Sequence, residues 1–267
     1  MDDAQIVQLY WDRNEQAIHA TSDKYGNYCT SIAKNILGNQ EDAEECVNDT
    51  YLNAWNAQPF GRYLWNSIVV TVGTTAGQII SCSLVAYGFA RYNFKGKNVL
   101  FMILLSTMMI PWDVTMIPQY MEFKLFGWIN TLKPLIVPSW FGSAYYIFLM
   151  RQFLMGVPKD YEEAARIDGA NAFQIYSRIF MPILRPQLIL VAVLNLLTVW
   201  NDYLGPLIFL QDRSKFTLAL GLASFKGVHN TQIVPMLCIT IIMIIPPILA
   251  FIGAQKYIIE GTSGSIK

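Results

Sequence analysis

The sequence predicts an all-α membrane protein, a polytopic helix bundle preceded by a short soluble helical segment. The chain is 54% hydrophobic and only 14% charged, which is too apolar for an ordinary soluble domain. Five long apolar runs follow residue 58. The charge balance also reverses, because residues 1–57 hold 10 acidic and 3 basic residues whereas residues 58–267 hold 9 acidic and 16 basic ones. We therefore predict two domains, 1–57 and 58–267.

The first domain is predicted to be soluble and helical. Gly38 and Asn39 form a helix stop and a new N-cap, and Val47, Tyr51 and Trp55 then recur on one helical face. No basic stretch followed by an apolar stretch opens the chain, so no signal peptide is expected.

Part of this domain resembles a known family. Tyr25–Trp55 is similar to the beginning of region 2 of extracytoplasmic-function sigma factors, but the likeness stops at about Asn56 and the promoter-recognising parts have no counterpart. The acidic balance also disfavours phosphate contacts, so no nucleic-acid partner is expected. Two readings stay open: an amphipathic helical fragment without a partner, or a sigma-like regulator tethered to a membrane.

The second domain is predicted to cross the membrane five times. Each apolar run reaches or approaches the roughly 20 residues that a helix needs to cross the hydrocarbon layer. Prolines at 111, 118, 246 and 247 predict kinks or breaks, which a helix bundle tolerates. Gly73 and Gly77 form a GxxxG pattern that favours close helix packing. The runs are approximately 64–89, 99–120, 135–153, 187–210 and 233–257.

A polar insert, Pro158–Pro186, separates the third and fourth runs. Pro158 suits the first turn of a helix, which we expect over residues 161–167. Gly169 is expected to turn the chain, because a residue without Cβ adopts positive φ at little cost. A second helix is predicted over 172–180, stopped by Pro182. The small Ala164 and Ala165 would let another protein approach the first helix closely.

The insert resembles the EAA loop of permease subunits of binding-protein-dependent ABC importers, in the sugar-transporting branch. The resemblance implies that the loop couples the permease to an ATPase subunit by docking in a cleft of that subunit; the alternative is a plain connector between two spans. The residues that carry the resemblance are Glu163, Ala164, Ala165, Asp168, Gly169, Ala170, Ile179, Pro182 and Pro186, and all of these except Pro186 are candidate coupling residues.

Other segments extend the resemblance over nearly all of residues 60–267. Phe60–Ser67 resembles the start of the family's second span, and Trp200–Leu207 and Ile259–Lys267 resemble segments of the sugar branch. The resemblance implies a MetI-like permease fold that lacks the first span. It also implies as partners a second permease subunit, ABC ATPase subunits and an extracytoplasmic sugar-binding protein, with membrane lipid around the bundle.

Four residues near the end of the fourth run are candidates for the sugar pathway, because a sugar needs hydrogen-bond partners and an aromatic face. The alternative is that they anchor a helix at the membrane interface. They are Asn195, Trp200, Asn201 and Asp202.

Basic residues between the runs predict the orientation. Ten of them lie on the side of the EAA-like loop and six on the other side, so the loop and the C-terminus are expected in the cytoplasm of a multi-pass protein of the cell (inner) membrane. Five spans would then place residues 1–57 outside, and we interpret these residues as a replacement of the family's first span. A non-functional chimeric or truncated reading frame is the alternative.

The chain is predicted to catalyse no reaction. It contains no G-x-x-x-x-G-K-[ST] motif, so ATP is expected to bind to a partner subunit and no cofactor to this chain. Its four cysteines form no CxxC pair, and its two histidines offer no zinc spacing. The predicted function is translocation of a sugar or oligosaccharide driven by a separate ATPase. A channel or secondary transporter would need no ATPase, and the EAA-like loop argues against both.

Overall fold

The computed structural model describes residues 49–225 and 233–263, with side chains up to Lys256. Every regular element in these ranges is a helix, which confirms the all-α prediction. Residues 49–56 are helical, whereas the rest of the sigma-like segment lies outside the described residues. The chain divides into two compact units, Met1–Gln58 with Phe225–Thr240 and Pro59–Ser224 with Ile241–Lys267.

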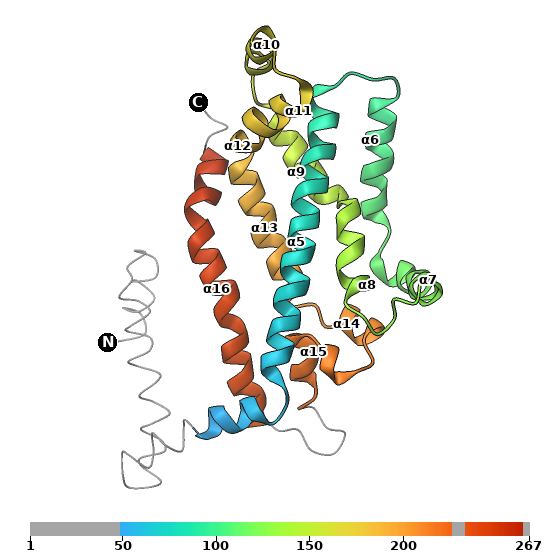
Figure 1. The fold of residues 1–267 in the computed structure, drawn as a ribbon, viewed down its shortest axis with the longest axis vertical. Coiled ribbons are helices and arrows are strands. Elements are labelled where there is room, and N and C mark those ends of the chain that lie inside the picture. Colours follow the sequence, from blue (N-terminus) through green and yellow to red (C-terminus); the bar gives the residue numbers. More distant parts are fainter. Residues whose placement is uncertain (1–48, 226–232, 264–267) are drawn as a thin grey trace, which may run out of the picture. The chain divides into compact units, whose positions relative to one another are not determined.

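The larger unit is organised around α5 (Phe60–Arg91), a helix of 32 residues that lies beside α9 (Ala144–Met155) and α13 (Arg185–Trp200) (Figure 1). The GxxxG pattern provides the close packing that the sequence predicts. A Cβ on Gly73 would lie 3.0 Å from Ile136, and one on Gly77 would lie 2.6 Å from the Trp140 ring. The two glycines therefore make room for the segment that precedes α9.

Two of the five apolar runs are single long helices. The first is α5, and the last is α16 (Ile233–Ser263). The second run breaks before Pro111, where the chain bends by 95° between residues 97–109 and α7 (Trp112–Leu125). Proline removes a helix N–H and disfavours helical geometry in the residue before it, which explains the break. Residues 97–109 comprise α6 (Lys97–Ser106) and the short helix η2 (Thr107–Met109).

The third and fourth runs are also interrupted. The third consists of α8 (Lys133–Ile136), η3 (Val137–Phe141) and α9, with Gly142 at φ 86° before α9. In the fourth, α13 ends at Trp200 and α14 (Leu204–Phe209) follows. By length and composition, two described helices can cross a membrane, or up to four if each bent pair is one span. The number of five spans stays a prediction.

The segment after α14 returns to the start of α5. It contains η5 (Arg213–Lys215) and α15 (Leu218–Ala223). Asn66 on α5 donates hydrogen bonds to the carbonyls of Ser214 (3.1 Å) and Phe216 (3.0 Å), and the Ser67 hydroxyl accepts one from Leu218 N–H (2.8 Å). These buried polar groups satisfy backbone atoms of the returning segment and fix it against α5.

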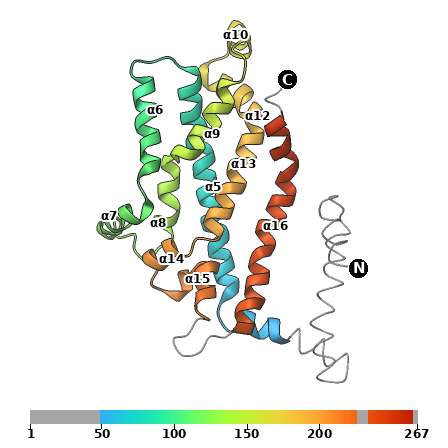
Figure 2. The same cartoon turned by 180° about the vertical axis from the view of Figure 1, so that it is seen from behind.

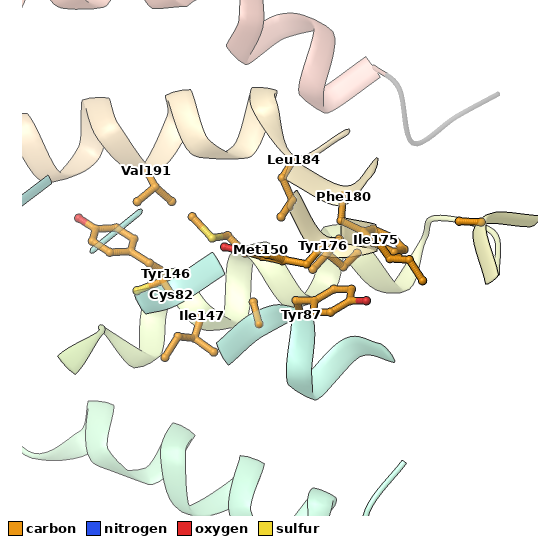
Figure 3. Packing of buried hydrophobic residues seen from close by; sticks show 13 residues of the cluster. Cys82, Tyr87, Tyr146, Ile147, Met150, Ile175, Tyr176, Phe180, Leu184 and Val191 are labelled. Carbon is orange, nitrogen blue, oxygen red and sulfur yellow. The ribbon is translucent and has the colours of Figure 1, made fainter. Parts of the chain in front are cut away.

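A buried apolar cluster joins α5 and α9 to the helical segment that follows the EAA-like turn (Figure 3). Tyr87 packs against Tyr176 and Phe180, with ring centroids 5.4 and 5.1 Å apart. The Ser83 and Tyr176 hydroxyls are hydrogen-bonded at 2.8 Å. The base of the EAA-like loop is therefore held by the core of the bundle.

Candidate functional site

The EAA-like loop projects from one end of the bundle as the helix α10 (Asp160–Ile167) (Figure 1). Gly169 follows with φ +80°, as the sequence predicts. Gly169 N–H donates to Arg166 O (3.1 Å) and Ala170 N–H to Ala165 O (2.9 Å). This pair of bonds is a Schellman motif, which requires a left-handed residue at the glycine position. The motif explains the order Asp168-Gly169-Ala170 and fixes the angle at which α10 stands.

The second helix of the loop, predicted over 172–180, begins at the expected residue but ends later than predicted. Asn171 caps α11 (Ala172–Ile175) in a reciprocal capping box with Gln174. The chain then forms a π-helical turn, η4 (Tyr176–Phe180), and continues in α12 (Met181–Ile183). The prediction that Pro182 stops the helix is wrong. Pro182 lies within a helical run that continues from Ala172 through the π-helical turn to Ile183. This run ends at Leu184 with a 71° bend into α13.

The outer face of α10 differs from the predicted one at a single residue. Glu163 and Ala164 are exposed, but Ala165 is only 7% exposed and packs into the core cluster. Ala165 shares a helix face with the buried Glu162, three residues earlier, and this face is turned to the bundle. Ala165 therefore supports α10 and does not offer a contact surface.

The remaining predicted loop residues divide in the same way. Asp168, Gly169 and Pro182 are exposed, whereas Ala170 and Ile179 are half-buried against the core cluster. The predicted set thus contains both residues that a partner can touch and residues that hold the loop in place.

Sequence reasoning missed three exposed apolar residues on the loop. Tyr161 is 55% exposed, Phe173 71% and Ile167 86%. Ile167 lies three and four residues after Ala164 and Glu163, so these three share one face of α10. The available signal was an isoleucine at the end of a short helix that is rich in charged residues. Exposed side chains of this size at the end of a membrane bundle indicate a surface for another protein.

The two glutamates of α10 have different surroundings. Glu162 accepts a hydrogen bond from Arg166 at 2.6 Å, and this bond, together with the charge of the glutamate, raises the pKa of the Arg166 guanidinium. Glu163 is the next residue, about 100° further around the helix, and it is exposed. Glu163 is therefore the carboxylate of the pair that can meet a positively charged partner.

Arg91, the last residue of α5, fixes the start of the loop. Its Nη2 donates to the carbonyl oxygens of Leu154 and Val157, both at 2.8 Å. Its guanidinium carbon lies 4.6 Å from the centroid of the Phe180 ring. A single side chain thus connects α5 with the end of α9 before the loop and with η4 after it.

The structure gives the polar candidates for the sugar pathway local partners. Asn195 is buried, and its Nδ2 donates to the hydroxyls of Thr74 (3.1 Å) and Thr75 (2.9 Å) on α5. Asn201 is exposed and donates to Leu197 O, one turn back in α13. Asp202 accepts a hydrogen bond from Gly205 N–H at 3.1 Å. These contacts are those of helix packing and helix ends.

Trp200 explains why α16 continues through its two prolines, where the sequence predicts a kink or a break. Pro247 has no N–H, so the carbonyl of Met243 lacks its helical donor. The buried indole Nε1 of Trp200 donates to Met243 O at 2.9 Å and replaces that donor. Of the predicted kink or break, the break does not occur, because Pro246 and Pro247 both lie inside α16. The kink stays a prediction.

Trp200→Phe is expected to destabilise the protein by about 1–3 kcal/mol, because a buried carbonyl loses its donor. In a Pro247→Ala background the backbone N–H of residue 247 can bind Met243 O, so the same substitution should cost less. Unfolding of the detergent-solubilised variants measures both costs. Trp65→Phe is the control, since Trp65 is 64% exposed. If Trp200→Phe destabilised the wild type and the Pro247→Ala variant equally, Trp200 would not be the donor that replaces the missing N–H of Pro247.

A groove of about 580 Å³ lies between α5, α13 and α16. It is lined almost entirely by small and aliphatic side chains, among them Ala76, Ala192 and Gly253. A sugar needs several hydrogen-bond partners, so this groove by itself does not fit one. The described residues contain no group of three potential metal ligands.

The apolar helices and the projecting helix-turn-helix loop define an integral membrane subunit with a surface for a partner protein. The chain belongs to the family of binding-protein-dependent transport system inner membrane components, whose model matches residues 78–262. The resemblance seen in the sequence is thereby confirmed, and the chain is a permease subunit of such a transport system.

Related proteins agree with this membership. The chain is 34% identical to an arabinooligosaccharides transport system permease protein of Halalkalibacterium halodurans, over 78% of this chain and 73% of that protein. It is 30% identical to a lactose transport system permease protein of Rhizobium radiobacter, over 76% and 74%. The crystal structure of a bacterial ABC transporter for alginate import contains a chain with the same fold, with a TM-score of 0.69, 24% identity and 78% of each chain covered.

Proposed function

We propose that this chain forms part of the pathway by which a sugar or oligosaccharide enters the cell, with energy supplied by a separate ATPase. Two relatives at 30% identity or more are named as permeases for arabinooligosaccharides and lactose. The sugar-branch segments around Trp200 and at the C-terminus support the same class. The proposed partners are a second permease subunit, ABC ATPase subunits that bind the ATP, and an extracytoplasmic sugar-binding protein.

In this proposal, the exposed face of α10 is the surface that contacts the ATPase subunit. Glu163, Ala164 and Ile167 project from the bundle on a short helix whose base is fixed by the core. A helix with a carboxylate, a small residue and a largely exposed isoleucine is suited to a cleft with an apolar floor and a basic rim. A movement of the ATPase would then pass through α10 into α9 and α13.

The orientation belongs to the same proposal. The C-terminal end of α16 lies at the same end of the bundle as α10, and so does the connection between α5 and α6 (Figures 1 and 2). Nine of the ten basic residues counted on the loop side are among the described residues, and they lie in or next to these segments and the EAA-like loop. Cytoplasmic loops are enriched in Lys and Arg, so we place this end in the cytoplasm, where the ATPase is.

Glu163→Lys is expected to lower recovery of the ATPase subunit when the transporter is purified through this chain, by roughly fivefold if about 1 kcal/mol of interaction is lost. Glu122→Lys is the matched control, because Glu122 is exposed on α7, away from the loop. Unchanged recovery with Glu163→Lys would place the contact elsewhere.

The substrate class is tested in proteoliposomes that contain the assembled transporter and its binding protein. ATP-dependent uptake of labelled oligosaccharides is expected, and uptake of amino acids is not. Uptake of amino acids alone would refute the sugar assignment and leave the coupling proposal untouched.

A further inference from the structure

A polar cavity lies at the start of α6, at the end of the bundle that carries the EAA-like loop. A cavity of about 490 Å³ is formed by the connection between α5 and α6 and by α9. Polar residues dominate its wall, and two of them are cations, Lys97 and Arg151. The cavity is separate from α10 and from the apolar groove.

The first turn of α6 presents unused hydrogen-bond donors to this cavity. Gly96 precedes the helix at φ +84°, and no side chain caps it. Among the residues that the structure describes, the N–H groups of Asn98 and Val99 have no acceptor. The first turn contains no acidic residue. The partial positive charge of the helix start is therefore unneutralised.

Arg151 supplies an independent observation. Its guanidinium carbon lies 4.0 Å from the centroid of the Phe101 ring, which fixes the orientation of the group. Its Nε atom is buried and has no hydrogen-bond partner. The Nε has almost no accessible surface and Arg151 as a whole is half-buried, so the donors that it offers to a ligand in the cavity are its terminal Nη groups.

The charges around the cavity are of one sign. Arg151 and Lys159 are the charged side chains that act electrostatically on Lys97. No carboxylate in the described ranges forms an ion pair with Lys97 or Arg151. The Lys97 ammonium donates to Tyr92 O at 2.9 Å and keeps two further protons for another acceptor. The site is therefore built for an anion with several oxygen atoms.

The surface that continues from the cavity is apolar. Val99, Met102 and Ile103 on α6 are 56%, 65% and 56% exposed. Val99 also lines the cavity, so this apolar surface begins at the cavity itself, and it is of the kind that faces hydrocarbon in a membrane protein. A ligand that joins a phosphate to acyl chains matches both parts, since its chains can lie along α6.

We propose that this cavity, formed by Asn93, Gly96, Lys97, Asn98 and Arg151, binds the phosphate group of an anionic phospholipid. We call it the headgroup site. The free N–H groups of α6 and the two cations bind the phosphate oxygens, and the exposed face of α6 carries the acyl chains. The lipid then fixes α6 against α9 at the end of the bundle that carries the EAA-like loop.

The test uses the full-length protein in detergent and native mass spectrometry with palmitoyl-oleoyl phosphatidylglycerol or phosphatidylcholine. We expect preferential binding of phosphatidylglycerol. Removing both cations in Lys97→Gln/Arg151→Gln should weaken it roughly 25-fold, which is about fivefold for each charge. Lys124→Gln, which removes an exposed charge on α7, should leave the affinity unchanged.

Asn98→Asp keeps the test decisive if the double variant does not fold. A carboxylate in the first turn of α6 favours the helix, so thermal stability should be retained. It repels phosphate, so phosphatidylglycerol binding should fall roughly fivefold. Unchanged binding by Asn98→Asp, or equal binding of both lipids by the wild type, would overturn the proposal. Displacement of the lipid by inorganic phosphate alone would assign the site to a small anion and also overturn it.

Discussion

Gly169→Val is expected to abolish uptake while the helix bundle stays assembled. Gly169 has φ +80°, and no atom lies within 4 Å of the position of an added Cβ. The penalty is therefore conformational and not steric, and a β-branched residue at positive φ costs about 1–3 kcal/mol. The Schellman motif can relieve this cost by opening, which would release α10 from its fixed angle. Uptake and ATP hydrolysis in proteoliposomes measure the result.

Two further variants distinguish an effect on the Gly169 turn from a general loss of folding or assembly. Gly127→Val introduces the same side chain at φ +66°, also with nothing within 4 Å, in the loop after α7. It should assemble and transport. Gly169→Asn should retain much of the uptake, because asparagine tolerates the left-handed conformation. Sugar binding to the separate binding protein should be unaffected throughout. Normal uptake by an assembled Gly169→Val variant would refute the role of the turn in coupling.

Local signals in the sequence were sufficient for α10 and its turn. The helix over 160–167 and the positive φ of Gly169 follow from residues within a few positions of each other, because a Schellman motif is a local structure. The direction in which Ala165 faces is different. It depends on which side of α10 packs on the bundle, and a helix of eight residues with acidic residues on both sides does not reveal that.

Long-range contacts account for the other differences. Pro247 breaks a helix by local rules, but Trp200 supplies the missing donor from 43 residues away in the sequence. No local pattern contains that information. The break in the third apolar run did have a local signal, since Pro134, Pro138 and Gly142 all lie within or next to it. Counting apolar residues overlooked that signal, because hydropathy ignores backbone restrictions.

The membership of the family was predictable because its motif combines residue types and spacing. The headgroup site was not predictable, since Lys97 and Arg151 are far apart in the sequence and meet only through the packing of α6 on α9. In the sequence, Lys97 and Arg151 counted only among the basic residues that predict how the chain is oriented in the membrane. Their convergence on a helix start with free N–H groups is a property of the fold.

Arg91→Met is expected to produce the largest loss of stability, roughly 2–4 kcal/mol, because two carbonyls lose a charged donor. Methionine preserves an unbranched, apolar side chain of similar length, so the change mainly removes the hydrogen bonds to Leu154 and Val157. Both acceptors lie where α9 ends and the loop begins. The loss should therefore also loosen the base of the loop against η4, where Phe180 contacts the guanidinium.

A purely structural role for Arg91 and a role in positioning the loop predict different measurements. If Arg91 positions the loop, Arg91→Met should lower the uptake achieved per ATP hydrolysed in the fraction that assembles, and Arg91→Lys, which keeps a charged donor, should restore part of it. Arg178→Met is the control, since Arg178 is exposed on the same loop. If Arg91→Met is less stable but achieves the same uptake per ATP hydrolysed as the wild type, Arg91 only stabilises the bundle. A lowered ratio would show that the hydrogen bonds at the end of α9 transmit the movement of α10, because they connect the exposed helix with α5.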